Sequence, residues 1–319
     1  MKSSNSKNRL AIVVPCYNEE KVLPITFELF SNKIYQLVSS GKISSDSFIL
    51  YIDDGSKDNT WSLIYNLSKK HTVVKGASLS RNRGHQFALL AGLMEAKNMA
   101  NVVVSMDCDG QDDINAIDNM LDKYYEGYDV IYGVRSSRNT DSFFKRFTAE
   151  LYYKILNALG AETVFNHADY RMTSVKVLNE IENYKEVNLY LRGLFPLVGF
   201  KSTTVYYSRN ERMAGKSHYP LSKMVALAFE GITSLSIKPI NIIVVLGFLL
   251  SCISLIFVVV FGLRGNFSNT NMLIKFISSI LTLCLGLVII SIGVVGEYVG
   301  KTYLETKHRP RYIINDKTY

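Results

Sequence analysis

Two carboxylates one residue apart form the pattern with the clearest chemical meaning in this chain. Asp107 and Asp109 flank Cys108, directly after the apolar run at residues 102–106. Such a run predicts a buried strand, and acidic residues at its carboxyl end lie where α/β sheets bind ligands. Mg²⁺ prefers oxygen ligands and is usually held by one or two carboxylates together with substrate phosphates. The pair therefore predicts a metal and nucleotide-diphosphate site, although on its own it also fits a solvated turn or a helix cap.

Apolar runs of strand length alternate with helical stretches from residue 9 to about residue 135. The predicted strands are 10–14, 48–52, 73–79, 102–106 and 129–133, and the predicted helices are 20–39, 58–70 and 86–100. This alternation predicts an α/β fold with a doubly wound, mostly parallel sheet. The carboxyl ends of its strands would gather Asn18, Asp53, Asp54, Arg81, Asp107 and Asp109.

The C-terminal third contains two long apolar stretches, at residues 240–263 and about 276–300. Each has about 24 residues, enough to cross a membrane as a helix, and a pair of buried core helices is the alternative. Basic residues collect before the first stretch and after the second, which places both termini in the cytoplasm. The predicted parts are a cytoplasmic catalytic domain (1–220), an interfacial amphipathic helix (221–238), two transmembrane helices (239–300) with an external loop (264–275), and a cytoplasmic basic tail (301–319).

The net charge of +8 has two possible meanings, nucleic-acid binding or contact with anionic lipid. Because the basic residues cluster beside the apolar stretches, we expect lipid contact and no nucleic acid. Residues 142–160 mix aromatic and basic residues at helical spacing, which fits either an interfacial helix or an amphipathic core helix. The polar start of the chain leads directly into a strand, so we expect no secretory signal. The four cysteines have no spacing typical of a metal site or a disulfide framework.

Four motifs in the first half of the chain resemble glycosyltransferase family 2. They are Val-Val-Pro-Cys-Tyr-Asn-Glu-Glu at 13–20, Asp-Asp-Gly-Ser-Lys-Asp-Asn-Thr at 53–60, Ser-Arg-Asn-Arg-Gly-His-Gln at 80–86 and Asp-Cys-Asp-Gly-Gln-Asp at 107–112. Further motifs at 168–171, 191–193, 209–221 and 296–301 are similar to those of polyprenyl-phosphate glycosyltransferases, the GtrB-like and dolichol-phosphate-sugar synthases. The resemblance covers roughly residues 9–314. It implies a GT-A type fold and a nucleotide-sugar donor.

For the donor, the resemblance implies one set of nucleotide-binding residues and one metal site. The nucleotide-binding set is Pro15, Tyr17, Glu19, Asp53, Asp54, Arg81 and Asp107. Asp53 or Asp54 would accept a hydrogen bond from the imide N–H of uracil, a role that suits a carboxylate, while a plain turn is the alternative. Asp109, assisted by Asp107, would hold Mg²⁺ or Mn²⁺ across the donor's two phosphates.

For the acceptor, the resemblance implies that Asp169 is the catalytic carboxylate. A lipid phosphate is already anionic near neutral pH, so Asp169 either takes up a residual proton or orients a substrate, and a turn or helix cap is the alternative. The candidates for binding the sugar or the acceptor phosphate are Gln111, Asp112, Arg171, Arg192, Arg209, Arg212, Lys216 and Ser217. Departures from the family pattern at Arg83, Asp113 and His218 remove no proposed ligand, but His218 puts one acceptor-phosphate contact in doubt.

Together these features predict a multi-pass enzyme of the cytoplasmic membrane, which we expect to be a homo-oligomer. It would transfer a hexose, glucose first, from a UDP-sugar to undecaprenyl phosphate with inversion, for cell-envelope glycan modification. A GDP-mannose-using synthase and a non-catalytic membrane scaffold that keeps the nucleotide-binding fold are the alternatives. A processive polysaccharide synthase is disfavoured, because the single tryptophan, Trp61, is not in the Gln-x-x-Arg-Trp context of that class.

Overall fold

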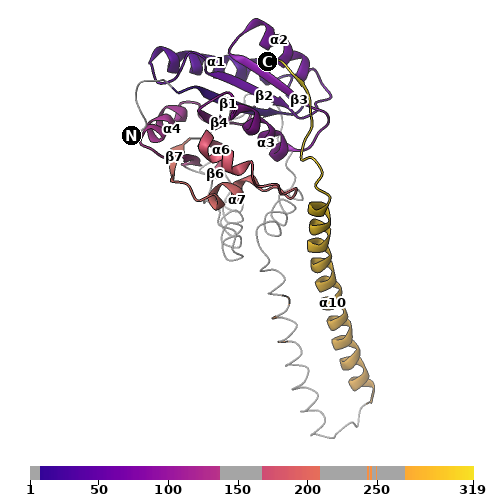
Figure 1. The fold of residues 1–319 in the computed structure, drawn as a ribbon. Coiled ribbons are helices and arrows are strands. Elements are labelled where there is room, and N and C mark those ends of the chain that lie inside the picture. Colours follow the sequence, from indigo (N-terminus) through magenta and orange to yellow (C-terminus); the bar gives the residue numbers. More distant parts are fainter. Residues whose placement is uncertain (1–7, 137–166, 209–242, 244, 246–248, 250–269) are drawn as a thin grey trace.

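The computed structural model describes residues 8–136, 167–208, 243, 245, 249 and 270–319. These residues form an α/β domain from which one long C-terminal helix projects (Figure 1). The predicted first membrane span, the interfacial helix at 221–238 and the stretch at 142–160 lie outside the described residues, apart from positions 243, 245 and 249.

Four parallel strands form the centre of the sheet: β1 (Leu10–Cys16), β2 (Phe48–Asp53), β3 (Val74–Leu79) and β4 (Val102–Ser105). β1 lies between β2 and β4, and β3 extends the sheet beyond β2. Every residue of β1, β2 and β4 is buried, as expected for strands that are covered on both faces. β1 continues through Pro15, beyond the predicted end at residue 14, because a proline without an N–H is tolerated near a strand end.

Four further strands make the sheet mixed: β5 (Val130–Arg135), β6 (His167–Ser174), β7 (Ser202–Tyr207) and β8 (Ile314–Lys317). The order in the described sheet is β7-β5-β6-β4-β1-β2-β3-β8. β6 runs antiparallel to both β4 and β5, whereas β7 is parallel to β5. The predicted parallel arrangement is therefore confirmed for the centre, and β6 and β8 are antiparallel additions.

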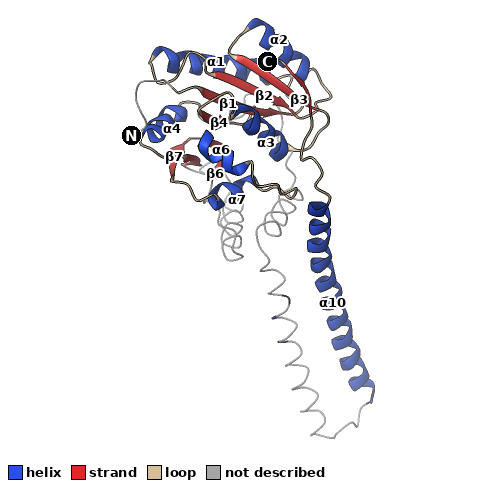
Figure 2. Ribbon diagram, viewed as in Figure 1, coloured by secondary structure: helices blue, strands red, loops and turns tan. Residues whose placement is uncertain are grey.

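Helices cover both faces of the sheet (Figure 2). One face packs against α1 (Leu23–Ser39), α2 (Thr60–Lys70) and α4 (Ala116–Tyr125). The other face packs against α3 (His85–Ala96), α6 (Val175–Ile181) and α7 (Leu191–Leu197). Alternate residues of β1 enter the two cores, with Ile12 on the first face and Val13 on the second. This two-sided burial fixes the carboxyl ends of the central strands as one rigid edge.

The long helix α10 (Thr270–Thr306) contains a stretch, Leu287–Thr306, that is long and apolar enough to cross a membrane. Large apolar side chains along α10, such as Leu281, Ile289 and Val299, are exposed. The helix begins at Thr270, so residues 270–275 of the predicted external loop are helical, and it continues past the predicted end at residue 300.

The segment predicted as a basic tail instead ends in the sheet. After α10 the chain runs back along the α/β domain, and β8 pairs antiparallel with β3, with Lys317 opposite Ala77 (Figure 1). The edge of β3 presents backbone N–H and C=O groups that an added strand can pair. Tyr312 and Ile314 pack on the core beside α3, which explains why this segment folds against the domain despite its charge.

Candidate functional site

The antiparallel direction of β6 brings Asp169 to the edge where the central strands end. Ser105, the last residue of β4, is the register partner of Arg171, and its hydroxyl donates to the carbonyl of Asp169 at 2.5 Å. Asp107 stands two residues after the end of β4, so residues from two distant parts of the sequence meet at one edge. This is the edge of an α/β sheet at which ligands bind.

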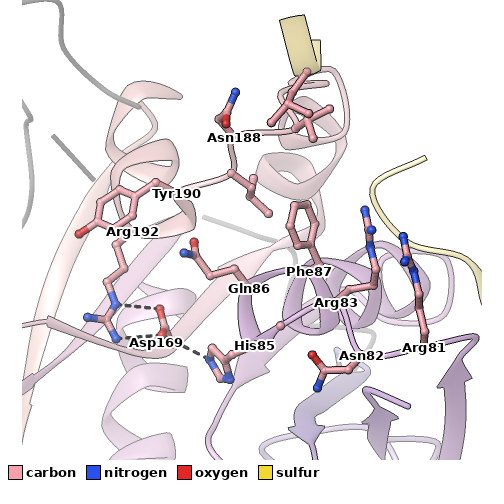
Figure 3. A pocket seen from close by; sticks show the side chains of 14 residues that line it. Arg81, Asn82, Arg83, His85, Gln86, Phe87, Asp169, Asn188, Tyr190 and Arg192 are labelled. Atoms are coloured by element: carbon pink, nitrogen blue, oxygen red, sulfur yellow. Dashed lines mark hydrogen bonds and ion pairs between the residues drawn. The ribbon is translucent and has the colours of Figure 1, made fainter. Parts of the chain in front are cut away.

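Asp169 lies between two basic side chains (Figure 3). Arg192, in the first turn of α7, donates from Nε to Oδ1 at 3.1 Å and from a terminal nitrogen to Oδ2 at 2.9 Å. On the other side, His85 Nε2 lies 3.4 Å from Asp169 Oδ2 and 3.7 Å from Asp107 Oδ1. The imidazole, which begins α3, therefore bridges the predicted catalytic carboxylate and a predicted metal ligand.

These contacts determine the charge states of Asp169 and His85. Burial alone would raise the pKa of Asp169, but Arg192 and His85 outweigh it and hold that pKa well below its usual range. Burial alone would lower the pKa of His85. The hydrogen bond to Asp169 and the negative charge of Asp107 outweigh burial and raise the pKa of His85 to about 9. Asp169 is thus a stable anion and a weak base at neutral pH, which suits an orienting role better than proton abstraction.

Asp53 and Asp54 are both buried, and their oxygens accept hydrogen bonds from the protein. Asp53 accepts from Ser56 N at 3.2 Å and from Ser78 Oγ at 2.9 Å. Asp54 accepts from the backbone N–H groups of Arg83 and Gly84 at 2.7 and 2.9 Å, and burial raises its pKa. Asp53 therefore makes a hydrogen bond typical of a turn, to the N–H three residues further on, whereas Asp54 fixes the separate loop at residues 80–84. A uracil contact by either carboxylate stays a prediction.

The loop after β1 is tied to the loop after β2. Asn18, with φ of 56°, accepts from Lys57 N at 2.8 Å, and its own N–H donates to Ser56 Oγ at 2.9 Å. Glu19 N donates to Thr60 Oγ1 at 2.8 Å. Pro15 is buried in β1, whereas the Tyr17 side chain is 40% exposed and presents a surface on which a base could stack. Arg81 is also exposed, at the rim of the pocket described below.

The Asp107–Asp112 segment carries three carboxylates, those of Asp107, Asp109 and Asp112. Asp107 is partly exposed, and Asp109 is buried with its Oδ1 accepting from Gln111 N at 3.1 Å. Asp112 accepts from the Tyr207 hydroxyl at 2.6 Å, while its buried Oδ2 has no hydrogen-bond partner among the described residues. Burial and then Asp107 raise the pKa of Asp112 to about 6. In the described part of the chain, no group of three or more His, Cys, Asp or Glu side chains lies close enough together to hold a metal ion.

A pocket of about 610 Å³ opens beside Asp169 (Figure 3). Its walls come from the loop at 80–84, the start of α3, the segment 187–192 and Leu304 near the end of α10. His85, Gln86, Asn188 and Tyr190 also line this pocket, and no role was predicted for them from the sequence. His85 and Gln86 belong to the motif at 80–86, and that motif could have indicated them as functional residues. The other two lie in a loop whose sequence carries no comparable pattern.

Arg171 does not reach this pocket. Its side chain is 1% exposed, its nitrogens have no hydrogen-bond partner among the described residues, and its guanidinium lies 3.5 Å from the ring centroid of Phe195. Burial lowers its pKa to about 10. This placement does not support the predicted phosphate-binding role, because β6 turns the side chain into the core beneath α7. Arg209, Arg212, Lys216 and Ser217 lie outside the described residues.

Comparison with known proteins decides the family. The model of glycosyl transferase family 2 matches residues 11–182. The chain belongs to this family. The match begins in β1 and ends just after α6, and it therefore includes Asp53, Asp54, Asp107, Asp109 and Asp169.

Relatives match this chain over nearly its full length, as two examples illustrate. An uncharacterized glycosyltransferase of Bacillus subtilis (strain 168), YkoT, is 45% identical over 312 residues, covering 97% of this chain and 92% of that protein. The bactoprenol glucosyl transferase of Shigella phage SfV is 36% identical over 319 residues, covering 97% of this chain and 99% of that protein. Among solved structures, the glucosyl-3-phosphoglycerate synthase of Mycobacterium tuberculosis is 18% identical with a TM-score of 0.47, covering 72% of this chain and 79% of that one.

Proposed function

We propose that this chain transfers a hexose, with glucose as the first candidate, from a UDP-sugar to undecaprenyl phosphate at the cytoplasmic face of the membrane. The observation that carries the proposal is the position of Asp169, held as an anion beside Asp107 at the ligand edge of a family 2 fold. The full-length similarity to a bactoprenol glucosyl transferase supports a polyprenyl phosphate as the acceptor.

In the proposed reaction, an oxygen of the lipid phosphate attacks the anomeric carbon of the sugar. The bond from that carbon to the diphosphate breaks, the electron pair leaves with UDP, and the configuration at carbon inverts. No proton has to be removed from the nucleophile, since a phosphate monoester is already anionic. Asp169, fixed by Arg192 and His85, orients the sugar or the acceptor.

The donor would lie across the loops after β1, β2 and β4. Asp109 and Asp107 are the residues that would hold Mg²⁺ or Mn²⁺, which when bound offsets the charge of the leaving diphosphate. Asp112 adds a third carboxylate to this edge, and its Oδ2 is buried without a hydrogen-bond partner among the described residues. Tyr17 and Arg81, both exposed, are candidates for contact with the base and the phosphates.

In the proposed arrangement, the N-terminal domain lies in the cytoplasm and the C-terminal third anchors it in the membrane. Residues 1–220 would form the cytoplasmic domain, 221–238 an interfacial helix and 239–300 two membrane spans, in a homo-oligomeric multi-pass protein. The apolar stretch Leu287–Thr306 of α10 and its exposed side chains support the second span. Such an anchor would bring a lipid head group to the edge that carries Asp169.

The test is a donor panel assayed with the full chain in lipid nanodiscs, undecaprenyl phosphate and Mg²⁺. We expect radiolabel from UDP-glucose to enter the lipid fraction, and Asp109→Ala to abolish this transfer. Label from UDP-galactose or UDP-N-acetylglucosamine alone would change the sugar, and transfer from GDP-mannose alone would overturn the UDP assignment. UDP binding without transfer from any donor would support a non-catalytic scaffold.

A further inference from the structure

The last turn of α10 is bonded to the loop that precedes α7. The carboxylate of Glu305 accepts from Val187 N at 2.9 Å through each oxygen, from Asn188 N at 2.8 Å and from Asn188 Nδ2 at 2.7 Å. Asn188 Nδ2 also lies 3.4 Å from the carbonyl of Lys301, one turn earlier. A single carboxylate therefore satisfies two backbone N–H groups and one side-chain amide of this loop, and such charge-assisted hydrogen bonds are among the stronger ones in proteins.

The same loop leads directly to the predicted catalytic carboxylate. Three residues after Asn188, the N–H of Leu191 donates to Gln86 Oε1 at 2.8 Å. Arg192 follows and binds Asp169 through both carboxylate oxygens. The segment 187–192 is thus fixed at one end by α10 and at the other by α3, and Arg192 stands at the second end.

A second set of contacts ties the chain after α10 to both walls of the pocket. The Arg311 guanidinium donates to the carbonyl of Tyr184 at 2.6 Å, on the side of the Glu305 contact. On the opposite wall, Arg83 Nε donates to the carbonyl of Arg311 at 2.8 Å. The segment 305–311 therefore joins the loop before α7 to the loop at 80–84, and these loops face each other across the pocket.

We propose that Glu305 is a positioning residue that sets the place of Arg192, and through it of Asp169, from the end of the membrane helix. This inference rests on the proposed function for its catalytic consequence. In the described part of the chain, Glu305 makes no hydrogen bond or ion pair with a predicted substrate-binding residue, and it acts through Val187 and Asn188. The contact makes the geometry of the predicted catalytic carboxylate depend on the docking of α10.

The test compares Glu305→Gln with a control, Glu126→Gln, in the full chain in nanodiscs. Glutamine keeps the shape of Glu305 but replaces one acceptor oxygen with an amide that faces N–H donors. Glu126 carries the same charge and forms an exposed ion pair with Lys123 at the C-terminal end of α4. Loss of the Glu126 charge therefore does not change the loop at 187–192. Hydrogen exchange of peptides covering 187–194 and 85–96 is followed in each variant, together with steady-state kinetics.

In Glu305→Gln we expect amides of 187–194 to exchange about tenfold faster or more, while those of 85–96 exchange as in the wild type. We expect kcat to fall by about tenfold with the donor KM within about twofold, because the donor loops are not disturbed. Unchanged exchange at 187–194 overturns the proposal, and so does faster exchange spread evenly over the whole domain. If Glu305→Gln does not fold, Asn188→Ala, which removes only the amide side chain, is judged by the same criteria.

The exchange measurement also separates this inference from the proposed function. A wild-type protein that transfers no hexose, but whose segment 187–194 responds to Glu305→Gln as expected, contradicts the proposed function and supports the positioning contact. Wild-type transfer with no response of that segment contradicts the positioning contact alone.

Discussion

Arg192 binds both carboxylate oxygens of Asp169, at 3.1 Å from Nε and 2.9 Å from a terminal nitrogen. The planar guanidinium makes two parallel hydrogen bonds that fix the direction of the carboxylate as well as its charge. Lysine offers a single ammonium without this fork. The pair therefore links the start of α7 to the start of β6 in one defined orientation.

The first prediction concerns this pair. We expect Arg192→Lys to lower kcat by about 100-fold, because a carboxylate displaced by about 1 Å no longer orients its substrate. UDP affinity, measured by calorimetry, should stay unchanged, since lysine keeps the positive charge at this position. Lys176→Ala, at a side chain that is 67% exposed, serves as the control. Wild-type kcat in Arg192→Lys would show that the bidentate contact has no role in the reaction.

The second prediction concerns the pH dependence of stability. The pKa of His85 is raised from 6.5 to about 9 in the folded protein, so the stabilisation from its charge is fully present below pH 6.5 and is lost as the pH rises through about 9. In metal-free buffer, we expect the difference in melting temperature between wild type and His85→Gln to shrink across this range. A difference that stays constant with pH would mean that the imidazole is not charged in the folded state.

The third prediction concerns Asp54 and the loop at 80–84. Asp54→Asn replaces one acceptor oxygen by an amide donor that faces a backbone N–H, at a site where the carboxylate is 2% exposed. We expect the free energy of unfolding to fall by about 1–3 kcal/mol, measured by denaturant titration in detergent. Asp46 lies in an exposed turn, so Asp46→Asn is the matched control and should change the free energy of unfolding little. Equal stability of the two variants would contradict the structural role given to Asp54.

The fourth prediction concerns the packing of α3 on the sheet. A Cβ added at Gly92 would lie 2.4 Å from Val13 Cγ1 and 2.8 Å from Ile52 Cγ1. We expect Gly92→Ala to destabilise the domain by about 1–3 kcal/mol, although alanine favours a helix. Gly293→Ala, where an added Cβ meets nothing within 4 Å, is expected to be neutral or slightly stabilising. If Gly293→Ala proved more destabilising than Gly92→Ala, α3 would not pack this closely against β1 and β2.

The central strands and the ligand edge could be predicted from the sequence because the signals are local. A continuous apolar run such as 10–14, followed by motif residues, predicts both a buried strand and what stands at its end. The antiparallel course of β6 could not be predicted in this way, since it depends on pairing with β4 and β5 far away in the sequence. For the same reason, the burial of Arg171 against Phe195 was not foreseen.

The contacts around α10 depend even more on tertiary structure. Glu305 has an ordinary sequence context near the end of an apolar helix, and only the folded chain places it against Val187 and Asn188. β8 was also not predicted. The charged residues around Ile314 predict a solvated tail, and only the folded domain provides the edge of β3 with which this segment pairs. Asp169 was found from its motif, whereas its low pKa follows from neighbours in α3 and α7.

Mass spectrometry of the lipid product tests directly whether this chain joins a hexose to undecaprenyl phosphate. The full chain in nanodiscs is given UDP-[¹³C]glucose, undecaprenyl phosphate and Mg²⁺, and the extracted lipid is analysed intact. We expect a labelled hexose joined to the lipid through a single phosphate, with UDP released in equal amount. A labelled lipid that carries two phosphates, or UDP release without any labelled lipid, would contradict the proposed function.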